Sequence, residues 1–252
     1  MNSRSTRFSA VLGLLSAAAG ASAGNVGMYG NLFDTEDAAA LALVGHTSVA
    51  GINIGASLAP YDAVWLKRFG AAPTPAEAAN ILAYVNAGGC VFTDFETTNW
   101  WFDGTLASYA GTLLNNFYFP DPSFTQNSVV TVTNASNPIT TGLAPSWTGQ
   151  QPMEVFQAYQ LSTLDAAIDV AITLFPNQPW GTATLAPIPV VGTINIGLGR
   201  VALMFSDFAD FLAPDVNPNE YILLNNAVMC IPAPGVGALL LSAGALSLRR
   251  RR

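Results

Sequence analysis

The stretch from Thr74 to Phe95, TPAEAANILAYVNAGGCVFTDF, decides the fold class, because it joins a capped helix directly to a buried strand. Thr74 to Glu77 has the pattern of a capping box with proline at the first helical position, which predicts a helix beginning at Pro75. The apolar side chains of this helix recur at helical spacing, at Ala78, Ile81, Leu82 and Val85. Gly88-Gly89 ends the helix, and a strand follows at once over Cys90 to Phe95.

The same alternation of strand and helix extends toward the N-terminus. The expected strands lie over Asn25 to Gly30, weakly within Ser48 to Ile54, and over Asp62 to Phe69. Between the first two we expect a helix that is capped by Asp34 and has Glu36 and Asp37 in its first turn. The apolar face expected for the helix comprises Ala38, Leu41, Ala42 and Gly45. Strands separated by helices favour a parallel sheet covered on both faces.

The second half of the chain has a different pattern. It predicts a helix over Gly104 to Leu114 behind an Asp103 cap, strands over Ser128 to Asn134 and Ala167 to Phe175, a hairpin of Val190 to Ile196 with Arg200 to Ser206 around Gly197-Leu198-Gly199, and a closing helix from Pro218 to about Cys230. The fold class expected is therefore α/β, with a mostly parallel central sheet and an antiparallel hairpin in the C-terminal half.

Both ends of the chain look like removable signals. Met1 to Ala23 has Arg4 and Arg7, an apolar run over Phe8 to Ala19, and then Ala21-Ser22-Ala23. This pattern predicts a secretory signal that signal peptidase cleaves between Ala23 and Gly24.

The last stretch, Ile231 to Arg252, combines prolines, an uncharged apolar run and four cations. Its fourteen apolar positions, Gly235 to Leu248, would reach roughly 21 Å as a helix, short of the roughly 30 Å hydrocarbon layer of a bilayer. We therefore expect transient membrane contact through this tail, stopped on the cytoplasmic side by the basic end. A tail anchor or a hydrophobic C-terminal helix is the alternative.

The tail resembles the PEP-CTERM sorting signal of Gram-negative bacteria. The residues that carry this resemblance are Pro232, Ala233, Pro234, Arg249, Arg250, Arg251 and Arg252, with Ala233 where the commonest form has Glu. The resemblance implies removal of the tail by an exosortase and delivery to the cell surface or the exopolysaccharide matrix. The expected organisation is a signal peptide over 1–23, one domain over 24–230 and a sorting tail over 231–252.

The domain between these signals is strongly acidic. Gly24 to Cys230 is 207 residues long and holds three basic residues, Lys67, Arg68 and Arg200, against sixteen acidic ones, for a formal charge of −13. Nucleic acid is excluded as a partner, because its binding depends on contacts between cations and phosphates. Neutral sugars, such as extracellular polysaccharide, or cationic ions fit this charge better.

Several short motifs resemble class I glutamine-amidotransferase-like domains. They are Gly199-Arg200-Val201, Phe205-Ser206-Asp207-Phe208, and the helix bearing Leu223, Leu224, Asn225, Asn226 and Val228. Asn137 to Leu143, NPITTGL, is similar to a turn of the related trehalose-utilisation-type branch. The resemblance implies a flavodoxin-like sandwich.

The sequence does not place the catalytic groups of such enzymes in the required order. An active amidotransferase needs a nucleophilic Cys in a strand-to-helix elbow with a downstream His, whereas Cys90 opens its strand and the one histidine, His46, lies upstream. No Gly-x-Ser-x-Gly elbow and no metal-ligand spacing is present. We therefore expect no catalytic triad, no metal site and no cofactor.

Acidic and aromatic residues near the ends of two predicted strands form the candidate ligand site. They are Asp94, Glu96, Trp100 and Trp101 after one strand, and Asp207 and Asp210 after another. Open α/β sheets bind ligands beyond the carboxyl ends of their strands. Carboxylates beside aromatic faces suit a sugar, and paired carboxylates can also hydrolyse a glycoside. The structural alternative is that both tryptophans pack under a loop while the acids cap helices.

Cys90 and Cys230 are an even pair of cysteines in a chain expected to be exported, which favours a disulfide. In a parallel α/β sandwich the start of a strand and the end of its covering helix meet at one edge of the sheet. The alternative is two buried free thiols. The sequence as a whole predicts an exported surface or matrix protein whose domain is a non-catalytic binding or structural module, with a carbohydrate-active hydrolase as the rival interpretation.

Overall fold

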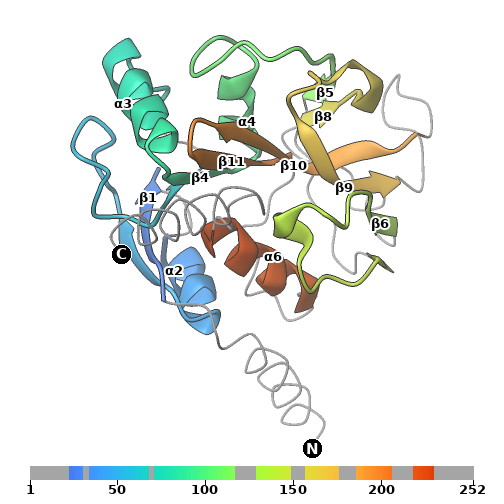
Figure 1. Ribbon diagram of the computed structural model, residues 1–252, viewed down its shortest axis with the longest axis horizontal. Helices are drawn as coiled ribbons and strands as arrows, with labels where there is room; N and C mark the ends of the chain where they lie inside the picture. The colour runs from blue at the N-terminus through green and yellow to red at the C-terminus, as the bar shows by residue number, and fades with distance from the viewer. Residues whose placement is uncertain are drawn as a thin grey trace, which may run out of the picture.

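The computed structural model describes residues 23–30, 34–67, 71–116, 129–148, 157–175, 186–205 and 218–229 (Figure 1). Most of the expected signal peptide, the sorting tail, Cys230, Asp207 and Asp210 lie outside these residues. None of the helices within the described ranges is both long and apolar enough to cross a lipid bilayer.

One large sheet organises the fold, and its strands follow the order β2-β1-β3-β4-β11-β10-β9-β6-β7. The parallel half consists of β2 (Thr47–Ala50), β1 (Asn25–Tyr29), β3 (Ala63–Leu66), β4 (Cys90–Thr93) and β11 (Gly199–Met204). The antiparallel half consists of β10 (Ile188–Ile196), β9 (Asp169–Phe175), β6 (Val129–Val132) and β7 (Ser146–Thr148). The expected α/β fold class is confirmed, and the antiparallel part extends beyond the expected hairpin to three further strands.

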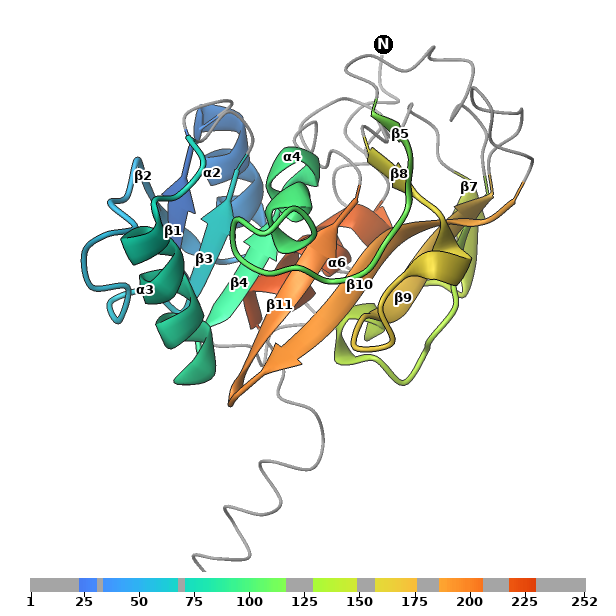
Figure 2. The same cartoon turned by 90° about the horizontal axis from the view of Figure 1, so that it is seen from above.

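Helices cover both faces of the parallel half (Figures 1 and 2). α2 (Asp34–Leu43) and α6 (Pro218–Met229) lie on one face, and α3 (Pro75–Asn86), α4 (Phe95–Thr98) and the short 3-10 helix η2 (Asn99–Trp101) lie on the other. Side chains alternate between the faces along each strand: Trp65 and Phe92 pack toward α6, whereas Val64 and Val91 pack toward α3. The continuous burial of these strands follows from having helices on both sides.

The fold-deciding stretch adopts the structure that its sequence predicts. Thr74 Oγ1 accepts a hydrogen bond from the Glu77 N–H, and Glu77 Oε2 accepts one from the Thr74 N–H at 2.8 Å, which completes the capping box of α3. Ala78, Ile81 and Val85 are buried against the sheet, with Leu82 partly buried beside them. The chain then enters β4 after two glycines.

The expected helix over Gly104 to Leu114 is wrong. Gly104 has φ +93°, and Leu106 and Tyr109 donate backbone hydrogen bonds to the carbonyls of Trp100 and Trp101, so the chain crosses over η2 in an extended path. The path ends in β5 (Leu113–Asn116), which pairs with β8 (Gln157–Tyr159) in a second small sheet. Asp103 caps only a local turn, in which its Oδ1 accepts from the Thr105 N–H at 2.8 Å.

Helix α2 forms where expected but turns a different face to the core. Asp37, Ala40 and Leu41 are buried, whereas Ala42 and Gly45 are exposed. Asp37 pairs with Lys67, which directly follows β3, at 2.6 Å between Oδ2 and Nζ, and neither side chain is more than 1% exposed. This buried ion pair sets the rotation of the helix, because Asp37 must face the sheet to reach the ammonium group.

The expected hairpin is confirmed, with Gly197 at φ +59° in the turn between β10 and β11. Gly199 approaches the end of α3 so closely that a Cβ atom there would lie 2.2 Å from the carbonyl oxygens of Val85 and Gly89. Glycine is therefore required at the point where β11 passes under the helix.

The NPITTGL turn joins α6 to the antiparallel half of the sheet. Asn137 caps the 3-10 helix η3 (Pro138–Thr140) and donates through Nδ2 to Asp169 at 2.9 Å and Thr193 at 2.7 Å. Asn226 of α6 donates to the carbonyls of Ile139 and Thr141 at 2.9 and 2.8 Å. This motif therefore has a structural role in the fold.

Candidate functional site

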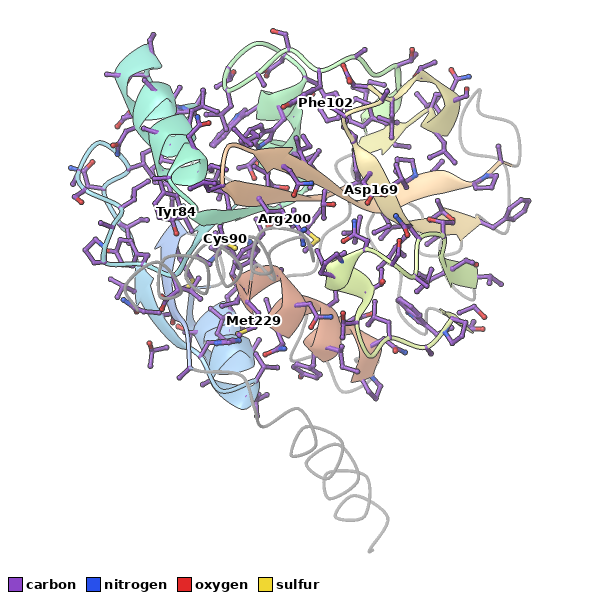
Figure 3. All side chains as sticks on the ribbon, viewed as in Figure 1. Tyr84, Cys90, Phe102, Asp169, Arg200 and Met229 are labelled. Carbon is purple, nitrogen blue, oxygen red and sulfur yellow. The ribbon has the colours of Figure 1, made fainter. Side chains whose placement is uncertain are left out.

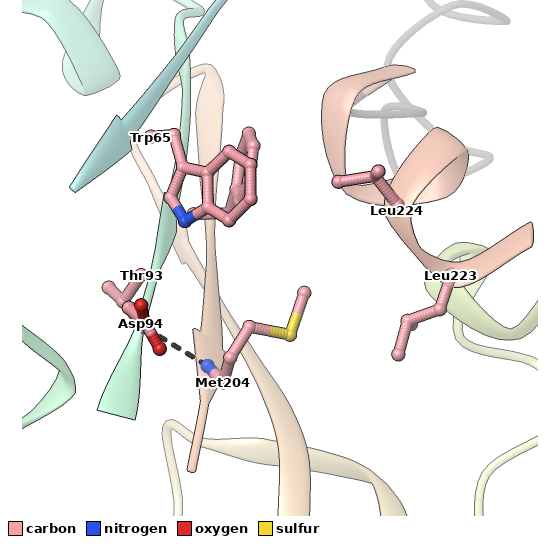
Figure 4. A pocket seen from close by; sticks show the side chains of 7 residues that line it. Trp65, Thr93, Asp94, Met204, Leu223 and Leu224 are labelled. Atoms are coloured by element: carbon pink, nitrogen blue, oxygen red, sulfur yellow. Dashed lines mark hydrogen bonds between the residues drawn. The ribbon is translucent and has the colours of Figure 1, made fainter. Parts of the chain in front are cut away.

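The carboxyl-terminal edge of the parallel strands holds Asp94 and Glu96, and a small cavity adjoins Asp94 (Figure 4). Asp94 directly follows β4, is 3% exposed, and accepts a backbone hydrogen bond from Thr98 in the short helix α4. Glu96 is partly buried on that helix. The adjoining cavity has a volume of about 10 Å³, enough for roughly one water molecule. Trp65, Phe92, Thr93, Asp94, Met204, Leu223 and Leu224 line it.

Three threonines close this edge by joining neighbouring strands. Thr93 Oγ1 accepts from the Met204 N–H at 3.0 Å and contacts the Thr98 hydroxyl, which donates to the Met204 carbonyl at 2.6 Å. The Thr97 hydroxyl bridges to the carbonyl of Leu66 at the end of β3. The ends of β3, β4 and β11 are thereby fixed to α4 by buried side chains.

Trp100 and Trp101 do not present exposed rings, which corrects the expectation of stacking surfaces at this edge. Trp100 is 8% exposed and Trp101 is fully buried. The segment after η2 folds back over both residues through its hydrogen bonds to their carbonyls. Asp94 borders the cavity on the α6 face of the sheet, whereas Trp100 and Trp101 pack in the core cluster on the α3 face. Asp207 and Asp210, the other half of the candidate site, lie outside the described residues.

A larger opening lies at the opposite edge of the sheet, where the parallel strands begin. The loop before β3 and the end of α3 form its two walls, and we call it the amino-edge groove. Its volume is about 470 Å³, within the roughly 300–1,000 Å³ range of small-ligand sites. It is lined by Ser57, Leu58, Ala59, Tyr61, Asp62, Asn80, Tyr84, Ala87, Gly88 and Gly89.

Several hydrogen-bonding groups of the amino-edge groove are held rigidly. Asn80 uses its Nδ2 group to donate to the carbonyls of Ile54 and Ala56, both at 2.7 Å, which leaves Oδ1 as its available acceptor. Asp62 Oδ2 accepts from the Asn25 N–H at 2.8 Å, while its Oδ1 accepts no hydrogen bond from the described residues. Acceptors fixed in this way lose little conformational entropy when a ligand binds.

Tyr84 forms the floor of the groove as a neutral phenol. Its hydroxyl donates to the Tyr61 carbonyl at 3.0 Å, and burial raises the pKa of Tyr84 to about 12, although a backbone hydrogen bond from Cys90 opposes the shift. The ring lies against Gly89, where a Cβ atom would come within 2.4 Å of it. Two aromatic side chains, Tyr61 and Tyr84, and one exposed carboxylate therefore border the same opening.

Cys90 directly follows Gly89, which lines this groove; it is disulfide-bonded, and no free cysteine occurs among the described residues. It is 1% exposed and borders a small cavity together with Asn226 and Ala227 of α6, the helix that ends at Met229 (Figure 3). Cys230 follows Met229 directly but lies outside the described residues. The pairing of Cys90 with Cys230 therefore stays a prediction.

Both ring nitrogens of His46 form hydrogen bonds within the fold. Its Nδ1 accepts from the Gly24 N–H at 3.0 Å, and its Nε2 lies 3.1 Å from Asn225 Oδ1. Burial lowers the pKa of His46, against smaller opposing effects from Asn225 and Asp62. Within the part of the chain that the structure describes, no three His, Cys, Asp or Glu side chains are grouped to hold a metal ion.

The amino-edge groove was not predicted from the sequence. Its residues come from an irregular loop and from the solvent side of a helix end, and neither carries a recognisable motif. A signal was nonetheless present: Tyr61 and Asp62 directly precede a buried strand, and Tyr84 lies off the apolar stripe of α3.

Comparisons with known proteins identify the fold of the domain but do not indicate an activity. No family model matches the sequence, and no curated protein matches it. Among solved structures, a ThuA-like protein from Bacteroides uniformis has a TM-score of 0.55 at 19% identity, covering 81% of this chain and 88% of that one. A ThuA-like protein from Parabacteroides merdae has a TM-score of 0.52 at 14% identity, covering 84% and 89%. A cytoplasmic protein from Salmonella typhimurium has a TM-score of 0.52 at 13% identity, covering 83% and 99%. The domain therefore has a flavodoxin-like α/β fold similar to that of these ThuA-like proteins.

Proposed function

We propose that the protein is exported and acts at the cell surface or in the extracellular matrix as a non-catalytic binding module. The disulfide at Cys90 carries this proposal, because disulfides persist in oxidising compartments and are rare in the cytosol. A sulfur in a disulfide cannot serve as a nucleophile, and His46 is already held by Gly24 and Asn225. The signal-like ends of the chain and its acidic domain agree with export.

Processing of both chain ends tests the export part of the proposal. We expect the protein recovered from the cell surface or medium to begin at Gly24 and to lack Arg249 to Arg252, because signal peptidase and an exosortase would remove the ends. Amino-terminal sequencing and intact mass measurement check this directly. Recovery of the unprocessed chain from the cytosol would overturn it.

We infer that the amino-edge groove binds a neutral saccharide. Asn80 Oδ1 and Asp62 Oδ1 are acceptors suited to sugar hydroxyls, and the Ser57 hydroxyl can donate. Tyr61 and Tyr84 add aromatic surface of the kind that packs against pyranose rings. The acidic character of the domain disfavours anionic sugars.

Binding to an array of neutral oligosaccharides, followed by titration of a glycan that binds, tests this inference. Asp62→Asn should weaken binding about tenfold, because a charge-assisted hydrogen bond becomes a neutral one. Ala59→Trp should abolish binding by filling the groove from an exposed position.

Asp103→Asn is the matched control, since Asp103 is another exposed carboxylate that accepts a backbone hydrogen bond at 2.8 Å. Absence of glycan binding, or binding insensitive to Ala59→Trp, would refute the inference.

The rival function, glycoside hydrolysis by carboxylates at the strand ends, makes a different prediction. It requires turnover of a bound glycan and loss of that turnover in Asp94→Asn. The burial of Asp94 and its backbone contact with Thr98 favour a structural role for this residue instead.

A further inference from the structure

Gly24, the residue before β1, is enclosed at the amino edge of the sheet. Its N–H donates to His46 Nδ1 at 3.0 Å, and its carbonyl accepts from the Thr47 N–H at 2.9 Å. Ala23, one residue earlier, is exposed. The chain therefore passes from solvent into a closed site within one residue.

The site around Gly24 binds backbone atoms and is tight for a side chain. A Cβ atom on Gly24 would lie 3.0 Å from Val228 Cγ1 of α6 and 3.3 Å from His46 Nδ1. Both distances are shorter than ordinary van der Waals contact. A side chain at this position would therefore require Val228 or His46 to shift by a few tenths of an ångström.

His46 is oriented to act as an acceptor toward Gly24. Because Nδ1 accepts a hydrogen bond, the proton of the neutral imidazole resides on Nε2, which donates to Asn225 Oδ1. The side chain is 4% exposed. Because both ring nitrogens of His46 are hydrogen-bonded, the lone pair of Nδ1 points to the nitrogen of Gly24, whether this is an amide or a free amine.

We propose that this site is a receptor for the α-amino group that cleavage of the chain creates at Gly24. The proposal rests on the export proposed above. Hydrolysis of the Ala23–Gly24 peptide bond adds the hydroxyl of water to the Ala23 carbonyl carbon and a proton to the Gly24 nitrogen. The amine then takes a second proton and becomes an ammonium group. This ammonium group keeps the hydrogen bond that the amide made to His46 Nδ1.

Asp62 supplies the compensating negative charge. Its Cβ lies 3.8 Å from the position that a Gly24 Cβ would take, and its carboxylate binds the next backbone N–H, that of Asn25, at 2.8 Å. The other elements around His46 bring no charge to it: β2 has none, α6 contributes Asn225 and Val228, and the acids of α2 lie in its first turn at the far end of the helix.

Protonation of His46 should disfavour binding of the Gly24 ammonium group, and the bound ammonium group should disfavour protonation of His46. An imidazolium ion has no acceptor at Nδ1, and it would lie about 3 Å from a like charge. The charge of the new amine should therefore lower the pKa of His46 further in the processed chain. Because folded His46 then binds its proton less readily than unfolded His46, stability is lost as the pH falls from about 6.5 toward the folded pKa.

His46 is the single histidine of the chain, so its imidazole resonance can be followed by NMR without assignment ambiguity. Three chains ending at Arg252 are compared: one beginning with a free Gly24 amine, the same chain N-acetylated, and one extended by Ala23. We expect the pKa of His46 to be lower by about one unit with the free Gly24 amine than in the other two chains. Equal values in all three chains would overturn the proposal, and so would a value in the Ala23 chain matching that of the free Gly24 chain.

Gly24→Ala in the processed chain is a second probe. The added methyl group should displace the amine, so that the pKa of His46 returns toward that of the acetylated chain. Because these chains have defined starts, they test the receptor whether or not signal peptidase cuts at this bond. Amino-terminal sequencing of the exported protein tests the cleavage separately.

Discussion

Reduction of the disulfide at Cys90 is expected to lower the free energy of unfolding by up to about 5 kcal/mol. If the partner is Cys230, the bond closes a loop in which 139 residues lie between the two cysteines. Closing so long a loop restricts the unfolded chain strongly. For a domain of this size, the loss would correspond to a fall in Tm of up to about 10–20 °C.

Chemical denaturation with and without a thiol reductant measures this effect. A Cys90→Ser/Cys230→Ser double variant is the control, because its stability should equal that of the reduced protein and should not respond to reductant. Alkylation of both sulfurs in the non-reduced, denatured chain, detected by mass spectrometry, would show that the two cysteines are not paired.

The Lys67→Met variant is expected to lose about 3–5 kcal/mol of stability. Lys67 and Asp37 are both buried, with their charged atoms 2.6 Å apart, and the ammonium group lies 5.9 Å from the centre of the Trp65 ring. Removing the lysine leaves the Asp37 carboxylate in the core without this cation. Desolvation of a carboxylate is costly when its charge is no longer compensated.

A double variant separates the cost of removing this cation from beside Asp37 from a loss of packing. Asp37→Leu/Lys67→Met should recover most of the stability lost in the single variant, because apolar side chains can replace a buried ion pair. Glu77→Gln provides a comparison at a partly exposed carboxylate and should change stability far less. Urea denaturation measures all three. A Lys67→Met variant as stable as the native protein would show that the pair contributes nothing.

The elements that the sequence predicted well are those with strong local signals. The capping box at Thr74 and the glycines at 197 and 199 determine their structure through a few neighbouring residues. The expected helix over Gly104 to Leu114 failed because its helical spacing reflects packing across an extended path. The positive φ of Gly104 and the pairing of β5 with β8 cannot be inferred from the spacing of apolar residues.

Prediction of the candidate site was limited for the same reason. The placement of Asp94 at the end of a strand could be predicted, because strand and helix alternate clearly around it. Its burial could not, since that depends on threonine contacts to β3 and β11, which are distant in sequence. Trp100 and Trp101 likewise look like surface aromatics in the sequence, and a later segment covers them.

The two outer strands of the large sheet are short. β2 has four residues and β7 has three. A long, flat outer strand offers unpaired N–H and C=O groups that can recruit a strand from another molecule, and short outer strands reduce this risk. At high local concentration, copies of this domain are therefore expected to remain separate molecules and not to polymerise into fibres through their sheets.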